Sequence, residues 1–162
     1  MSNFIGSESF NQSELVDAAV KVGEDTYPRI FAGYGAVLGI QSIDVIHQSA
    51  VCTQWSSDAH RSLEAHLSIV GFTGSVCVRR FSVGAANEHL RHDYIELSTD
   101  DGSEPLMADG TWQQFLPEAN KTDLSLPRVL AGTYHDCIEL ALEAGVPEQA
   151  AMLWDRSMTI EI

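Results

Sequence analysis

Three residues of the chain are of the types that together carry out nucleophilic chemistry with a thiol: Cys52, His92 and Asp109. A thiolate is the attacking group, a histidine beside it takes and returns the proton, and a carboxylate fixes the histidine tautomer and stabilises its charged form. Most free cysteines are instead small buried hydrophobic residues, and Cys52 alone would be read that way. The elements that carry the three residues therefore decide between the two interpretations.

A β-hairpin is predicted to carry the histidine and the aspartate. The segment His92–Leu97 places a ring or aliphatic side chain at nearly every step, as expected for a strand in a sheet, and Leu106–Ala108 returns to the core. Between them, Asp101-Gly102 favours a type I′ turn, because both residue types tolerate a positive φ. The sequence therefore predicts two adjacent antiparallel strands.

The register of this hairpin decides whether the two side chains meet. With Asp101 and Gly102 at the centre of the turn, residues that face each other have numbers that sum to 203, so Tyr94 faces Asp109. His92 shares a face with Tyr94 and becomes a diagonal neighbour of Asp109, about 7–8 Å away between backbones and within reach of its carboxylate. A slip of one residue would place the two on opposite faces.

Cys52 is predicted to lie in the first turn of a helix that spans Ser49–Val70, with Ser49 as the N-cap. There the free amide donors and the positive end of the helix dipole lower the pKa of a thiol. Residues that share one face of this helix recur at three- and four-residue spacing: Cys52, Trp55, Ser56, Ala59, Leu63 and Leu67.

Two local sequence patterns, around His92 and around Asp109, provide evidence beyond the types of the three residues. From His92 the sequence is H-x-aromatic-aliphatic-E-aliphatic, and around Asp109 it is aliphatic-x-D-x-T-W-x-Q-F. Both patterns resemble the His and Asp segments of transglutaminase-like, papain-type cysteine hydrolases. In that superfamily a Cys at the start of a helix precedes a His and an Asp on neighbouring strands. The resemblance covers Ala50–Leu67 and Leu90–Leu116, under a third of the chain. It implies Cys52 as nucleophile, His92 as general base and acid, and Asp109 as the residue that orients the histidine.

The surroundings of the cysteine depart from the family pattern. Such enzymes often have Gly or Asn close before the Cys and a small residue after it, whereas here the sequence is QSAVCTQW. A Gln upstream of the Cys donates to the oxyanion in papain-like enzymes, and Gln48 is the nearest candidate, at a shorter spacing. The backbone N–H of Cys52 is a second expected donor. Trp112 is a candidate wall of the cleft, whereas Phe115 is predicted to be core.

The resemblance implies a thiol-dependent amide or acyl hydrolase or acyltransferase that works through a thioester on Cys52. Water acting on a peptide bond would make it a protease, water acting on a Gln side chain a deamidase, and an amine a transglutaminase. The residues do not choose among these three. The alternative is a catalytically inactive protein-interaction domain of the same fold, which the irregular surroundings of Cys52 favour.

The length of 162 residues, with 44% hydrophobic and 20% charged residues, predicts one globular domain over 1–162. The order of helices, then strands, then helices predicts an α+β fold, with a central helix packed on an antiparallel sheet. The remaining predicted elements are a helix over 11–22 with an Asn11/Glu14 capping box and an end at Gly23, a second helix over 25–34, a strand over 75–83, a connection over 85–91, a polar loop over 118–127, a helix opened by Thr133 or Asp136, a short helix over 148–156 and a closing strand over 158–162.

The net charge of −14 argues against nucleic acids and anionic membranes as partners, and it suits a basic peptide or protein substrate. There is no apolar run of about 18 residues or more and no recognisable secretory signal, so cytoplasm is the default expectation. A protein exported or injected by a dedicated machine would look the same. Three cysteines, Cys52, Cys77 and Cys137, fit a reducing environment better than a disulfide scaffold. The oligomeric state stays open.

No metal or other cofactor is expected. His89 and His92 form an H-x-x-H pair, but a zinc site needs three or four suitably spaced ligands, and no Cys or His cluster in the sequence completes one.

Overall fold

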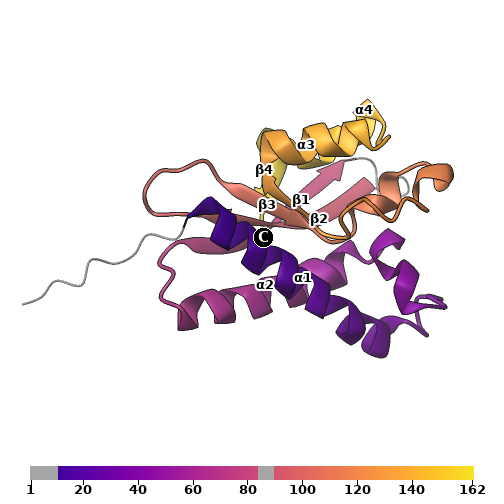
Figure 1. Ribbon diagram of the computed structural model, residues 1–162, viewed down its shortest axis with the longest axis horizontal. Coiled ribbons are helices and arrows are strands. Elements are labelled where there is room, and N and C mark those ends of the chain that lie inside the picture. The colour runs from indigo at the N-terminus through magenta and orange to yellow at the C-terminus, as the bar shows by residue number, and fades with distance from the viewer. Residues whose placement is uncertain (1–10, 84–89) are drawn as a thin grey trace, which may run out of the picture.

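The computed structural model describes residues 11–83 and 90–162. His89 and most of the connection predicted over 85–91 lie outside the described residues. Helices pack on a five-stranded antiparallel sheet, which confirms the predicted α+β class (Figure 1). The helices and strands are α1 (Gln12–Tyr34), α2 (Cys52–Ile69), β1 (Ser75–Val83), β2 (Leu90–Ser98), β3 (Leu106–Asp109), β4 (Leu130–Thr133), α3 (Tyr134–Glu143), α4 (Glu148–Ala151) and β5 (Thr159–Glu161).

The sheet forms the middle layer of the molecule, in the strand order β4-β3-β2-β1-β5. Helices α1 and α2 cover one face and α3 and α4 lie over the other (Figure 1). Each interface holds its own group of buried side chains, one around Trp55 and Ile95 and the other around Trp112 and Trp154. The tail forms the predicted closing strand, because β5 pairs with β1 at the sheet edge. Within the described ranges, no helix is both long and apolar enough to span a bilayer.

The predicted register of the β2–β3 hairpin is confirmed. Ile95 lies opposite Ala108, so the paired residue numbers sum to 203 as expected. The connection is wider than a two-residue turn, since β2 ends at Ser98 and β3 begins at Leu106. Within it, the Asp101 side chain accepts hydrogen bonds from the backbone amide and the hydroxyl of Ser103. Gly102 has the expected positive φ, 77°.

The predicted end of the first helix at Gly23 is wrong. The capping box of Asn11 and Glu14 is present, but α1 continues through the glycine. A Cβ at Gly23 would lie 2.9 Å from the Trp55 ring and 3.0 Å from a methyl group of Val129. The glycine is therefore required by helix packing and does not terminate the helix.

The second helix predicted over 25–34 is the C-terminal part of α1, so Pro28 lies inside a helix and not in a first turn. An internal proline removes one backbone hydrogen bond and typically costs about 3 kcal/mol. Tyr27 and Ile30, on either side of it, are both 2% exposed. Their burial offsets the cost, since a fully buried large side chain contributes about 1.5–3 kcal/mol.

The C-terminal third contains one strand that the sequence did not indicate. β4 has only four residues, and its Gly132 has a φ of 152°. Thr133 accepts a hydrogen bond from the Asp136 amide and caps α3, as predicted. The short helix predicted over 148–156 is shorter: α4 ends at Ala151 and 3₁₀ turns follow.

Candidate active site

Cys52 is the first residue of α2, two residues closer to the helix start than the sequence suggested. Ser49 is not the N-cap: it follows a 3₁₀ helix, Ile43–Gln48, and its hydroxyl donates to the Val45 carbonyl. The cap is Val51, whose side chain makes no capping hydrogen bond. The first hydrogen bond of α2 runs from the Trp55 amide to the Val51 carbonyl.

This start leaves the amides of Cys52, Thr53 and Gln54 without an acceptor inside the helix. No side chain in residues 11–83 or 90–162 caps them in the way a Ser or Asp would. The half-buried sulfur of Cys52 therefore lies beside free N–H donors at the positive end of the helix. Such donors are what an oxyanion hole requires.

His92 and Asp109 form a fully buried ion pair. His92 Nε2 donates to Asp109 Oδ2 over 2.6 Å, and both side chains are 0% exposed. Because the carboxylate can only accept, Nε2 carries the proton and Nδ1 is the nitrogen left for other chemistry. Nδ1 is buried and completes no hydrogen bond of standard geometry among the described residues.

Asp109 is held at both carboxylate oxygens. Oδ2 also accepts from the Trp154 indole over 2.8 Å. Oδ1 accepts from the Thr111 amide over 2.8 Å and from the Thr111 hydroxyl over 3.2 Å. Four donors thus stabilise the charged form, and although burial raises the pKa of Asp109, His92 and these donors hold it below its ordinary value.

Gly110 lets the chain leave β3 immediately after the aspartate. A Cβ there would come within 2.0 Å of the Trp55 ring, so only glycine fits. The Tyr27 hydroxyl donates to the Gly110 carbonyl over 2.8 Å, and the Trp55 indole donates to the Gly23 carbonyl over 3.1 Å. α1 and α2 therefore fix the position of Asp109 from the opposite side of the sheet.

Cys52 and His92 lie close enough to shift each other's pKa. Burial raises the pKa of the Cys52 thiol, but the neighbouring His92 imidazole and the Asp93 amide outweigh it, so the pKa lies below 9.0. Burial lowers the pKa of His92, but Asp109 and then Cys52 raise it to about 10. Contacts between nucleophile and base are commonly loose in free enzymes and tighten with substrate.

The structure thus brings together Cys52, His92 and Asp109, which the sequence had singled out. The two further site residues take other positions. Trp112 is fully buried and donates to the Pro127 carbonyl, so the suggestion that it walls the cleft is wrong. Gln48 donates its side-chain amide to the Lys121 carbonyl over 2.7 Å, which uses the group that was expected to bind an oxyanion.

Two residues that the sequence did not indicate contact the histidine. Phe115, predicted as simple core, is half-buried and lies edge-on to His92, with ring centroids 4.9 Å apart. Trp154 also lies edge-on to the His92 ring, with ring centroids 6.2 Å apart. Both rings donate a hydrogen bond to Asp109 Oδ2. No sequence signal links Trp154 to the site, because it lies 45 residues beyond Asp109.

Among the described residues, no group of three possible metal ligands includes His92. Its H-x-x-H partner His89 lies outside them, and its Nε2 is occupied by Asp109. The one group of possible ligands found in residues 11–83 and 90–162 comprises His135, Asp136 and Glu139, which are exposed on α3. Exposed acidic groups of this kind are common without an ion.

The three cysteines differ in environment, and this gives a first prediction. Burial raises the pKa of Cys77 to about 11 and that of Cys137 to about 12, whereas that of Cys52 is lowered. At neutral pH a larger fraction of Cys52 than of Cys77 or Cys137 is therefore thiolate, the form that reacts, and the higher intrinsic nucleophilicity of a thiol with a higher pKa offsets only part of this difference. We expect iodoacetamide to alkylate Cys52 at least about tenfold faster than either other cysteine, as measured by peptide mapping. Equal rates, or labelling only after unfolding, would contradict this ranking.

No model of a known protein family, no curated protein sequence and no solved structure gives a significant match to the chain.

Proposed function

We propose that the chain is a thiol-dependent amide or acyl hydrolase or acyltransferase with a transglutaminase-like, papain-type core. One observation carries the proposal: a thiol with a lowered pKa at an uncapped helix start lies beside a histidine whose other nitrogen is held by a buried carboxylate. A cysteine that served only packing would be expected to have a raised pKa, as Cys77 and Cys137 do.

In the proposed first step, the Cys52 thiolate attacks the acyl carbon and a tetrahedral oxyanion forms. The amide of Cys52 at the start of α2 is placed to donate to that oxyanion, in the role for which Gln48 had been considered. Protonated His92 gives its Nδ1 proton to the leaving group, which departs and leaves a thioester on Cys52. Asp109 keeps the proton on Nε2 and stabilises the charged ring throughout.

In the second step, water or an amine attacks the thioester carbon. Neutral His92 removes the proton of the incoming group at Nδ1, and the Cys52 sulfur departs as a thiolate. The ring is then charged again, so the cycle closes with no net change in the protein. The site contains nothing that selects protease, deamidase or transglutaminase chemistry, and all three share these steps.

The experiment that tests the proposal uses p-nitrophenyl acetate, an activated ester. We expect a burst of nitrophenolate, an acetyl group on Cys52 in the intact mass, and continued turnover as water resolves the thioester. Cys52→Ala should lose the burst and the turnover, whereas Cys77→Ala should keep both.

The alternative function, a catalytically inactive interaction domain of the same fold, predicts a different result. In that case Cys52 would either stay unmodified or keep its acetyl group indefinitely, because nothing would activate water. A burst without turnover would therefore contradict the proposed second step.

A further inference from the structure

The sequence neighbours of the two reacting residues are joined to each other by hydrogen bonds. Arg91 and Asp93 flank His92 in the sequence, and Thr53 follows Cys52. The Arg91 guanidinium donates to the Thr53 hydroxyl over 3.3 Å and to the Asp93 carboxylate over 3.3 Å. This bridge therefore ties the strand that carries His92 to the first turn of the helix that carries Cys52.

The alternation of side chains along β2 makes room for this bridge. Ile95 belongs to the buried group under α1 and α2, whereas Tyr94 belongs to the buried group on the other side of the sheet. Because successive side chains of a strand point to opposite faces, Arg91 and Asp93 lie on the Ile95 face and His92 lies on the Tyr94 face. β2 can thus hold the start of α2 with two side chains while the histidine between them faces the other layer.

Asp93 is the most rigidly held part of the bridge. Its side chain is 1% exposed, and Arg80 on the paired strand β1 binds both carboxylate oxygens, over 2.7 and 2.8 Å. Two-point pairs of this kind fix geometry more closely than a single hydrogen bond does. The backbone amide of Asp93 lies beside the Cys52 sulfur and is one of the groups that lower the pKa of the thiol. A displacement of Asp93 relative to α2 would therefore withdraw a donor from the nucleophile.

From these contacts we infer that Arg91 and Asp93 are positioning residues, which hold the start of α2 against β2 so that the Cys52 sulfur stays beside His92. The inference rests on the proposed function, because it concerns the geometry of the same nucleophile and base. Neither positioning residue needs to touch the substrate. A misplacement of about 1 Å between reacting groups can cost about a hundredfold in rate, so a bridge at this point acts directly on the reaction.

A through-space effect of charge is the competing explanation. Arg91 is positively charged and contacts the residue next to Cys52, and Arg80 is close enough to Cys52 for their charges to interact. A positive charge within about 4–6 Å favours a thiolate whether or not it makes a hydrogen bond. Thr53→Val separates the two explanations, because it removes an acceptor of the bridge and changes no charge.

The primary test measures the rate of Cys52 alkylation by iodoacetamide as a function of pH. We expect Thr53→Val to slow alkylation at neutral pH by about two- to tenfold, the usual effect of one hydrogen bond. The apparent pKa of the reaction should rise, because the thiol moves away from the groups that lower its pKa. The effect should persist at high salt, since no charge has been removed. Thr122→Val is the control, because it makes the same substitution at an exposed hydroxyl, and it should leave the profile unchanged.

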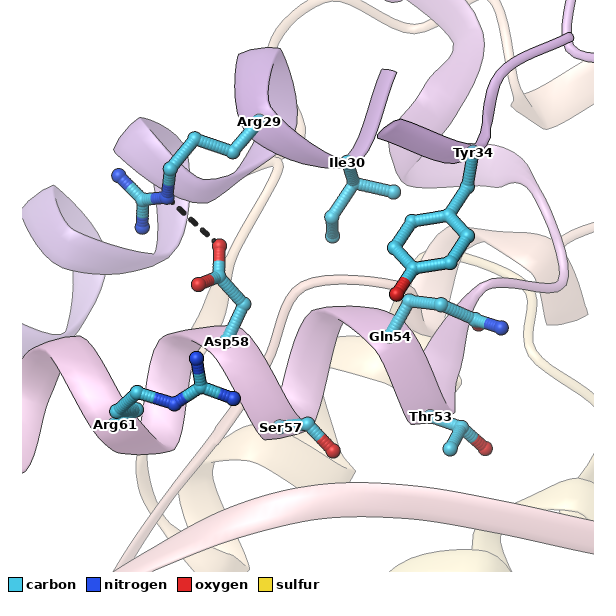
Figure 2. A pocket seen from close by; sticks show the side chains of 8 residues that line it. All are labelled: Arg29, Ile30, Tyr34, Thr53, Gln54, Ser57, Asp58 and Arg61. Atoms are coloured by element: carbon cyan, nitrogen blue, oxygen red, sulfur yellow. Dashed lines mark hydrogen bonds and ion pairs between the residues drawn. The ribbon is translucent and has the colours of Figure 1, made fainter. Parts of the chain in front are cut away.

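A double-mutant cycle tests whether Arg91 acts through Thr53. Arg91→Gln should slow alkylation of Cys52 in the original protein, and its effect should be smaller by about twofold or more in the Thr53→Val background. Arg29→Gln is the matched control for the arginine. Figure 2 shows Arg29 of α1 reaching Asp58 of α2, where it forms an ion pair over 2.8 Å. Its effect on the rate should be small and the same in both backgrounds.

The outcomes separate this inference from the proposed function. If Thr53→Val keeps the original rate and pH profile while Cys52 remains the fastest-reacting cysteine, the positioning role is wrong and the proposed function stands. If Arg91→Gln has the same effect in both backgrounds, the arginine acts through its charge and the bridge is wrong. If Cys52 reacts no faster than Cys77 and Cys137 in the original protein, both are overturned.

Discussion

Replacing Asp109 with Asn should lower the free energy of unfolding by about 3–5 kcal/mol, because it leaves buried groups without their partner. Each carboxylate oxygen accepts two hydrogen bonds: Oδ2 from His92 and Trp154, and Oδ1 from the amide and hydroxyl of Thr111. An Asn has one acceptor oxygen and one NH₂ group. In either orientation the NH₂ group faces two donors, which then lose their acceptor.

The same substitution should reduce turnover of p-nitrophenyl acetate by about 10³–10⁴-fold in protein that is shown to be folded. The reason is that the carboxylate no longer holds the proton on Nε2 or stabilises the charged ring. Denaturant unfolding measures the first effect and steady-state kinetics the second.

Asp123→Asn provides the control for the aspartate substitution. Asp123 is exposed, and within the described part of the chain its carboxylate accepts hydrogen bonds from Ser125 alone. Its unfolding free energy should change by no more than about 0.5 kcal/mol, and its turnover should not change. An Asp109→Asn protein as stable and as active as the Asp123→Asn protein would refute a supporting role for the buried carboxylate.

Replacing His92 with Gln is expected to lower turnover by about 10²–10⁴-fold, because both steps lose their proton carrier. Alkylation of Cys52 by iodoacetamide should also slow, by about tenfold or more at neutral pH. In this variant burial still raises the thiol pKa, while the histidine interactions that lower it are absent.

His66→Gln is the matched control for this substitution. His66 lies in the last turn of the helix that begins at Cys52, and it is exposed. It should keep the alkylation rate and the turnover of the original protein. If His92→Gln retained both as well, the histidine would have no part in the chemistry and the site would be structural.

The position of His92 relative to Asp109 could be predicted from sequence because it depends on local rules. The period of two in a strand and a glycine-containing connection are enough to set the register, and the register held although the turn is wider than expected. The placement of Cys52 in a first turn also followed from helical spacing. Its exact start did not, because Val51 replaces a polar cap and no local signal marks it.

The parts that could not be predicted depend on tertiary packing. Gly23 was predicted to end a helix, whereas it is needed because the Trp55 ring and Val129 pack against it, and the same ring leaves room only for glycine at position 110. Trp112 follows the aspartate by three residues, yet it turns into the core. The tryptophan that packs against His92 is Trp154, which is distant in sequence and equally buried.

The most direct test of the central claim is a pH titration of the Cys52 thiolate by its ultraviolet absorbance, taken as the difference between the protein and its Cys52→Ser variant. We expect this difference to titrate below pH 9.0 in the original protein, and above that value when His92 is replaced by Gln. A Cys52 that titrates at or above 9.0 in the original protein, with no shift when His92 is removed, would contradict it.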